Sequence, residues 1–225
     1  MSRHFPDASA NYLYNANAIL TAAPITVAAW FTCDTALPLH DMVIWSDSNG
    51  TILNRFRLLI EGSSIPDRGT IRWAVATGGT SSRAQTSTVI SADTWHHACG
   101  VEAASNDRRV YLDGGGKGIN SAIRVPAGVN QMYIGRCVPA APDPMDGRLG
   151  HISVWNIALT DSEVATLAAG ISPLMVHRNN LVGYWPINGQ SPEPDFVGGY
   201  NMTLTGTIPK SEEPSKMIGR RIIAP

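Results

Sequence analysis

The fold is decided by residues 25–33, Ile-Thr-Val-Ala-Ala-Trp-Phe-Thr-Cys, where apolar side chains recur at every second position. One face of an extended chain would carry Ile25, Val27, Ala29 and Phe31. A period of two is typical of a β-strand that buries one face in a core. This stretch therefore predicts a core strand, and the rest of the chain can be compared with it.

The same alternation recurs downstream in short runs, at residues 56–60, 71–75, 95–101, 110–112, 132–134, 152–154 and 181–185. The segments between them are rich in Gly, Asp, Asn and Pro, as at residues 47–50, 66–69, 78–79 and 113–116. These residue types favour turns between strands. Many short strands at this spacing predict an antiparallel sandwich or barrel rather than a sheet of βαβ units.

One short helix is predicted at residues 161–169. Thr160 and Glu163 have the spacing of a capping box, in which each side chain bonds the other residue's backbone amide. Val164 and Leu167 follow at helical spacing, and Gly170 stands where a helix commonly ends.

Five segments, in order, resemble the laminin-G-like jelly-roll domain of the concanavalin A-like lectin/glucanase superfamily. They are PITVAAWF (24–31), TWHHA (94–98), RVYLDG (109–114), MYIGR (132–136) and DGRLGHISVWNIALT (146–160). A sixth piece, residues 181–186 with 201–206, resembles the opening segment of such modules. The resemblance implies an all-β, antiparallel two-sheet jelly-roll sandwich that binds glycans or proteins, without specifying a ligand.

The domain organisation follows from where this pattern ends. We expect one jelly-roll sandwich over residues 1–208, followed by a C-terminal extension or arm over residues 209–225. The arm mixes apolar and basic side chains that suit docking on a partner or a neighbouring copy. Its candidate partner-binding residues are Met217, Ile218, Arg220, Arg221, Ile222 and Ile223.

Composition narrows the function classes. Charged residues are 16% of the chain and the formal net charge is −1, which argues against nucleic acid or an anionic membrane as a partner. The N-terminus shows no secretory signal, and no run approaches the length that spans a bilayer. The three cysteines, Cys33, Cys99 and Cys137, are widely spaced and odd in number, so we expect buried thiols.

Catalytic and metal chemistry find little support in the residue pattern. A retaining glycosidase needs two carboxylates roughly 5 Å apart, and the nearest such pair, Glu193 and Asp195, flanks a proline in an expected loop. We therefore predict no enzyme activity, no catalytic residues and no metal ligands. Calcium at Asp143 and Asp146 stays open as an alternative, although Leu149-Gly150-His151 replaces the family's usual Ile-Asp-Glu.

Two further predictions concern a histidine and a tryptophan side chain. His97 is expected to be a hydrogen-bonded core histidine rather than a ligand, because it shares the inward face of Trp95 and Cys99. Its strand neighbour His96 must point to the opposite face, so the two cannot chelate one metal together. Trp155 is the candidate carbohydrate-binding residue, as a solvent-facing ring on which a sugar stacks.

The function predicted from these features is that of a non-catalytic virion structural protein. A recognition fold without a signal peptide fits a protein made in the host cytoplasm and carried on the particle, as capsid decoration or a tail-associated protein; the layout resembles jelly-roll proteins of tailed phages. Its partners would be other virion proteins, copies of itself in a homo-oligomer, or a cell-surface glycan. The alternative is a free carbohydrate-binding, lectin-like module, and a weaker alternative is a glycoside hydrolase.

Overall fold

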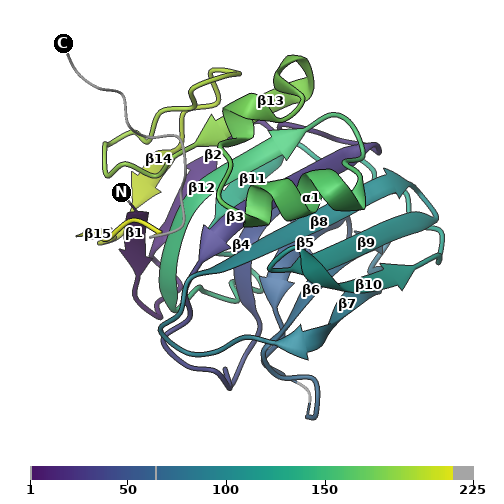
Figure 1. Ribbon diagram of the computed structural model, residues 1–225, viewed down its shortest axis with the longest axis horizontal. Coiled ribbons are helices and arrows are strands. Elements are labelled where there is room, and N and C mark those ends of the chain that lie inside the picture. Colours follow the sequence, from purple (N-terminus) through teal and green to yellow (C-terminus); the bar gives the residue numbers. More distant parts are fainter. Residues whose placement is uncertain (1, 64, 215–225) are drawn as a thin grey trace.

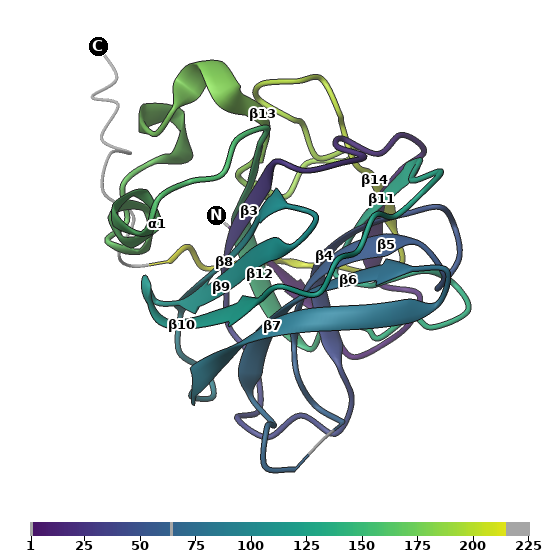
Figure 2. The ribbon, with the colours of Figure 1, turned by 90° about the vertical axis from the view of Figure 1, so that its right-hand side faces the viewer.

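The computed structural model describes residues 2–63 and 65–214, which form two antiparallel sheets packed face to face (Figures 1 and 2). The eight-stranded sheet contains, in spatial order, β10 (Gly115–Asn120), β9 (Asp107–Leu112), β8 (His96–Ala104), β3 (Ile25–Phe31), β12 (Gly147–Trp155), β1 (Ser2–Phe5) and β15 (Lys210–Ser211), with β13 (Leu181–Trp185) also paired to β12. The seven-stranded sheet runs β14 (Thr203–Thr205), β2 (Tyr12–Asn15), β11 (Gln131–Ile134), β4 (Met42–Ser48), β5 (Arg55–Ile60), β6 (Thr70–Thr77) and β7 (Thr80–Val89). The predicted all-β, two-sheet jelly roll is confirmed.

The main core lies between the two sheets. It contains the alternate residues of β3 that were predicted to share a buried face, and each of them is fully buried: Ile25, Val27, Ala29 and Phe31. Trp73 of β6 reaches across and packs against Gly100 of β8, where an added Cβ would lie 2.3 Å from the indole ring. A glycine at position 100 therefore lets the ring approach the opposite sheet closely.

Helix α1 (Asp161–Ala168) covers the outer face of the eight-stranded sheet, as Figure 2 shows. The predicted capping box is present: Thr160 accepts from the Glu163 amide, and Glu163 accepts from the Thr160 amide at 2.8 Å. Two short 3₁₀ turns follow, η1 (Pro173–Met175) and η2 (Arg178–Asn180). Val164 and Leu167 of α1 pack on a second apolar cluster at this outer face.

None of the described helices covers the outer face of the seven-stranded sheet, which is formed by side chains and loops. One row of residues crosses all seven strands in register: Thr203, Tyr14, Tyr133, Ser46, Arg57, Ala74 and Arg83. Residues paired in register point to the same side of a sheet. Within the described residues, no helix is long and apolar enough to cross a membrane.

The first residues of the predicted arm are part of the sandwich. Lys210 and Ser211 form β15, which pairs with Arg3 and Ser2 of β1 at the edge of the eight-stranded sheet. The six candidate partner-binding residues, from Met217 to Ile223, lie outside the described residues, so their role stays a prediction. All three cysteines are buried and free, as expected.

Asp47 is placed differently from the predicted turn at residues 47–50. It is still part of β4 and is 0% exposed, and the turn begins only at Asn49. Its Oδ2 accepts from the amides of Ile19 and Leu20, at 3.2 and 3.3 Å, and so anchors the loop that leads into β3. Burial raises the pKa of this carboxyl well above its ordinary value.

The Asp47 carboxyl predicts a pH dependence of stability. A carboxyl whose pKa is raised on folding stabilises the protein below its unfolded pKa, and that stability is lost as pH rises through the folded pKa. We expect the free energy of unfolding of the wild type, relative to Asp47→Asn, to fall between about pH 4.5 and about pH 8. Urea titrations at both values, with Asp93→Asn as control because the Asp93 side chain is 71% exposed, would measure it. A difference that stays constant with pH would contradict the assignment.

Candidate carbohydrate-binding face

Three tyrosines gather on the outer face of the seven-stranded sheet. Tyr12 and Tyr14 flank the core residue Leu13 on β2, so both rings point away from the core. Tyr133 on β11 pairs in register with Tyr14, and the two ring centroids lie 5.1 Å apart. The centroids of Tyr12 and Tyr133 are 6.0 Å apart. We call Tyr12, Tyr14 and Tyr133 the tyrosine strip.

One tyrosine of the strip is buried and held by a hydrogen bond, and the other two are partly exposed to solvent. Tyr133 is 4% exposed and donates to Gln131 Oε1 at 2.8 Å, whereas Tyr12 and Tyr14 are half-buried and present part of each ring to solvent. Burial, followed by the neighbouring Tyr14, raises the pKa of Tyr133. Its phenol therefore remains a neutral donor in this position.

Arg136 holds the outer end of the strip. Its guanidinium carbon lies 4.4 Å from the Tyr12 ring centroid and 5.8 Å from that of Tyr133. Nη1 donates to the Ser9 carbonyl at 2.7 Å, and Nε donates to its neighbour Cys137 at 2.9 Å. A guanidinium above an aromatic face is attracted to the ring and limits its rotation.

Polar groups border the strip on the neighbouring strands. Thr203 and Thr205 of β14 pair with Tyr14 and Tyr12, and Gln131 lies beside Tyr133. Asn15, at the end of β2, donates to the Asn201 carbonyl at 2.9 Å. Aromatic rings beside hydroxyl and amide groups offer both an apolar surface and hydrogen-bond partners, which is the composition of ligand sites in general.

Basic side chains continue the same face on β5. Arg57 Nη1 donates to Asp143 Oδ2 at 3.0 Å, and Arg55 Nη1 lies 3.3 Å from the Cys137 sulfur. Burial and the adjacent Arg57 lower the pKa of Arg55. The face thus changes from aromatic on β2 and β11 to cationic on β5.

The structure corrects the prediction for Trp155. This side chain is 0% exposed and belongs to the apolar cluster beneath α1, with Val164 and Leu167. Its Nε1 donates to the Val176 carbonyl at 2.9 Å. A ring enclosed on all sides offers no surface for a sugar, so the assignment of Trp155 as a solvent-facing platform is wrong.

The carboxylate pair considered for hydrolysis organises a loop instead. Glu193 is 0% exposed and pairs with Arg3, and it accepts from the amides of Asn188 and Gly189 at 3.1 and 2.7 Å. Asp195 accepts from the amides of Tyr184 and Val197, at 2.8 and 3.0 Å. Both carboxylates are occupied by backbone donors of β13 and of the segment that follows it.

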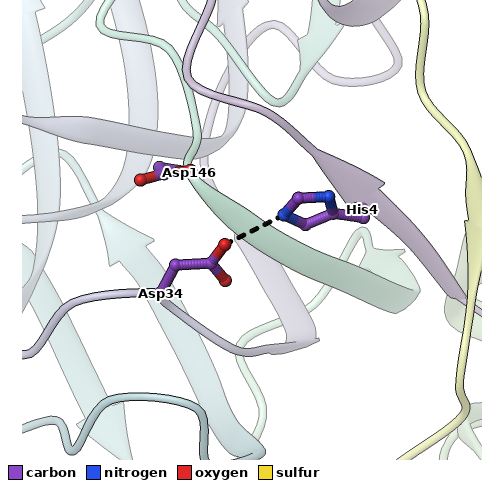
Figure 3. Close-up of side chains that lie close together, drawn as sticks. All are labelled: His4, Asp34 and Asp146. Carbon is purple, nitrogen blue, oxygen red and sulfur yellow. Dashed lines mark hydrogen bonds and ion pairs between the residues drawn. The ribbon is translucent and has the colours of Figure 1, made fainter.

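The two aspartates considered for calcium do not converge on each other. Asp143 pairs with Arg57, whereas Asp146 lies with His4 and Asp34 at one end of the sandwich (Figure 3). His97 is 2% exposed, so the prediction of a buried histidine is confirmed. It does not face the main core: it pairs in register with Trp30 on the outer face of the eight-stranded sheet, where the two rings meet edge-on with centroids 5.4 Å apart. Among the described residues its Nδ1 has no hydrogen-bond partner, which the prediction had required. Burial lowers the pKa of His97 to about 4, so it is neutral near pH 7.

A cavity of about 310 Å³ opens at the opposite end of the sandwich from these aspartates, at the start of β3 and the end of β8. Much of its wall is small and apolar, with Ala22, Ala23 and Ala103 beside Val125. The one ring that reaches it, Phe56, is 1% exposed. It therefore lacks the exposed aromatic surface that the tyrosine strip provides.

Comparison with solved structures finds the same fold in several proteins. A putative carbohydrate-binding protein from Bacteroides ovatus shares 19% identity at a TM-score of 0.64, covering 95% of this chain and 60% of that one. The CBM40 domain of the Ruminococcus gnavus IT-sialidase, bound to α2,3-sialyllactose, shares 12% identity at a TM-score of 0.57 (75% and 98% covered). Tailspike protein 2 of bacteriophage CAB120 of Escherichia coli O157:H7 shares 16% at 0.55 (84% and 28%).

Identities this low establish a shared fold and leave the ligand open. The family is shown separately, by a model described as "Concanavalin A-like lectin/glucanases superfamily" that matches residues 7–165. That span is most of the 225 residues. The chain therefore belongs to the concanavalin A-like lectin/glucanases superfamily.

Proposed function

We propose that this protein binds carbohydrate on the outer face of its seven-stranded sheet, with the tyrosine strip as the platform. The observation that carries the proposal is the arrangement of Tyr12 and Tyr14. Their rings lie partly exposed on one strand, beside the buried Tyr133, on the sheet face opposite the core.

Each part of the strip has a role in this proposal. The apolar C–H face of a pyranose ring would stack on Tyr12 or Tyr14, because an aromatic face is a rigid apolar surface. Sugar hydroxyls would bond the side chains of Thr203 and Gln131 at its border. Arg136, held by the Ser9 carbonyl, would keep the Tyr12 ring oriented before the ligand arrives.

The comparisons support binding over hydrolysis as the proposed activity. Two of the structural neighbours are described as carbohydrate-binding, and one of them carries a bound sialylated oligosaccharide. Their ligands belong to those proteins, and only the class of ligand is carried into the proposal. The occupied carboxylates of Glu193 and Asp195 favour the same choice.

The test is a pair of substitutions on the strip. We expect Tyr12→Ala combined with Tyr14→Ala to weaken binding to the best ligand of an array of neutral and sialylated glycans at least about tenfold, or about 1.4 kcal/mol. Calorimetry with that glycan would measure it, and circular dichroism would confirm folding. Phe196→Ala is the matched control, because Phe196 is 50% exposed but packs beside Tyr184 on the other sheet. Equal affinity of the double variant and the wild type would refute the site.

A location on a virus particle is kept as a second proposal. The likeness to a bacteriophage tailspike at a TM-score of 0.55 favours it, and glycan binding is compatible with it. Capsid decoration, tail association and a homo-oligomer are all parts of this proposal. Quantitative mass spectrometry of purified particles is expected to find the chain at a fixed copy number, and its absence from them would refute the location.

A further inference from the structure

Three potential metal ligands converge at one end of the sandwich, away from the tyrosine strip. His4 lies on β1, Asp34 follows β3 and Asp146 directly precedes β12 (Figure 3). His4 Nε2 and Asp34 Oδ2 are 3.0 Å apart, and one ligand atom from each of the three residues lies within 4.8 Å of the others. Ligand atoms this close to one another can contact a single ion.

The backbone explains why three distant segments meet there. Strands β3, β12 and β1 are neighbours in the eight-stranded sheet, and His4 pairs in register with Arg148. The Asp34 amide donates to the Asp146 carbonyl at 3.2 Å. Gly147 has a φ of +147°, and a Cβ there would lie 2.0 Å from the Thr32 carbonyl oxygen. The close approach of the two aspartates thus depends on a glycine.

The charges at this end favour a cation. The carboxylates of Asp34 and Asp7 lie close enough to Asp146 for their negative charges to repel its own. His40 lies 3.5 Å from Asp7, and Arg148 extends to Ser211, at 2.9 Å, and to 4.0 Å from Asp93. Bringing carboxylates together costs energy through mutual repulsion, and a bound divalent ion would remove that cost.

We propose that His4, Asp34 and Asp146 form a binding site for a divalent transition-metal ion of the Zn²⁺ type. The imidazole separates this cluster from an ordinary group of exposed acids, since Ca²⁺ takes oxygen ligands whereas Zn²⁺ is bound by imidazole and carboxylate together. His4 and Asp34 are 30% and 35% exposed, so the ion has access from solvent.

Cys33 is next in the chain but does not join the site. Its side chain is 0% exposed and belongs to the main core between the two sheets. Its sulfur instead lies 3.6 Å from the Met42 sulfur, inside the core.

The ion would tie the N-terminal strand to the sandwich. β1 pairs with β12 on one side and only with the two-residue β15 on the other. A ligand that binds the folded state alone stabilises it by mass action. With free Zn²⁺ at about 100 times its Kd, we expect the melting temperature to rise by roughly 5 to 10 °C.

The experiment uses the untagged full chain, stripped with a chelator, and compares Zn²⁺ with Ca²⁺. Calorimetry is expected to show one Zn²⁺ per chain, with weaker binding of Ca²⁺. His4→Gln and Asp146→Asn should each lower Zn²⁺ affinity at least tenfold, and at the same free Zn²⁺ concentration this removes about half of the thermal shift or more. His177→Gln is the matched control, because His177 also pairs with a carboxylate, Glu163, but lacks a third ligand.

Three results would overturn the proposal. The first is an absence of Zn²⁺ binding by the wild type, and the second is tighter binding of Ca²⁺ than of Zn²⁺. The third is unchanged Zn²⁺ affinity in His4→Gln, which would place the ion at another group of side chains. None of these results bears on glycan binding at the tyrosine strip, which lies on the other sheet.

Discussion

Replacing Arg108 with methionine is expected to lower the free energy of unfolding by about 3–5 kcal/mol. Arg108 and Glu102 are paired in the interior, with side chains 0% and 1% exposed. Nη2 and Nε of the arginine donate to the two carboxylate oxygens at 2.9 and 3.1 Å, and Trp73 Nε1 donates to Oε2 at 2.9 Å. Without the arginine, an acidic group stays buried with one neutral donor.

The pH dependence of this loss identifies its cause. Burial raises the pKa of Glu102, and Arg108 opposes that rise. In Arg108→Met the pKa of Glu102 therefore rises further, so the folded variant is stabilised by protonation and loses stability as pH increases. The destabilisation relative to the wild type should shrink in acid. Urea unfolding followed by tryptophan fluorescence at several pH values would measure it.

Arg109 provides the matched control, because it is the next residue on the same strand and also pairs with a carboxylate. Its partner Asp107 is 44% exposed, so Arg109→Met should cost less than about 1 kcal/mol. Adding Glu102→Gln to Arg108→Met should recover part of the loss, since no charge is then buried alone. Equal effects of Arg108→Met and Arg109→Met would contradict a buried ion pair.

The strands of the core could be predicted from the chain because alternation is a local signal. The period-two pattern of residues 25–31 identifies the face of β3 that packs between the sheets. The same pattern cannot say what covers the second face of a strand. Trp155 is an example. The alternation of β12 places it on the outer face of the sheet, and it is buried there because helix α1 and the segment that contains Val176 pack over it.

The tyrosine strip and the His4 cluster could not be predicted because their members meet only through strand order. Tyr12 and Tyr14 alternate with Leu13 over a strand of four residues, which is too short to distinguish a binding face from a core. Tyr133 joins them through the β2–β11 register. His4, Asp34 and Asp146 belong to three separate segments, none of which has the spacing of a metal motif.

Replacing Trp155 with alanine is expected to destabilise the fold by about 3–5 kcal/mol while leaving sugar affinity unchanged. The ring fills the space between β12 and α1, beside Leu159 and Leu167, and alanine would leave a cavity there. Trp155→Phe keeps most of that volume and loses the bond to the Val176 carbonyl, so it should cost about 1–3 kcal/mol.

The two readouts separate the packing role of Trp155 from a binding role. Stability is measured by urea unfolding, and glycan affinity is measured at a low temperature where Trp155→Ala is still folded. The tyrosine variants should show the opposite pattern, with affinity lost and a smaller loss of stability, because Tyr12 and Tyr14 are only partly buried. A folded Trp155→Ala with normal stability and no sugar binding would return the platform to Trp155 and refute the placement on the seven-stranded sheet.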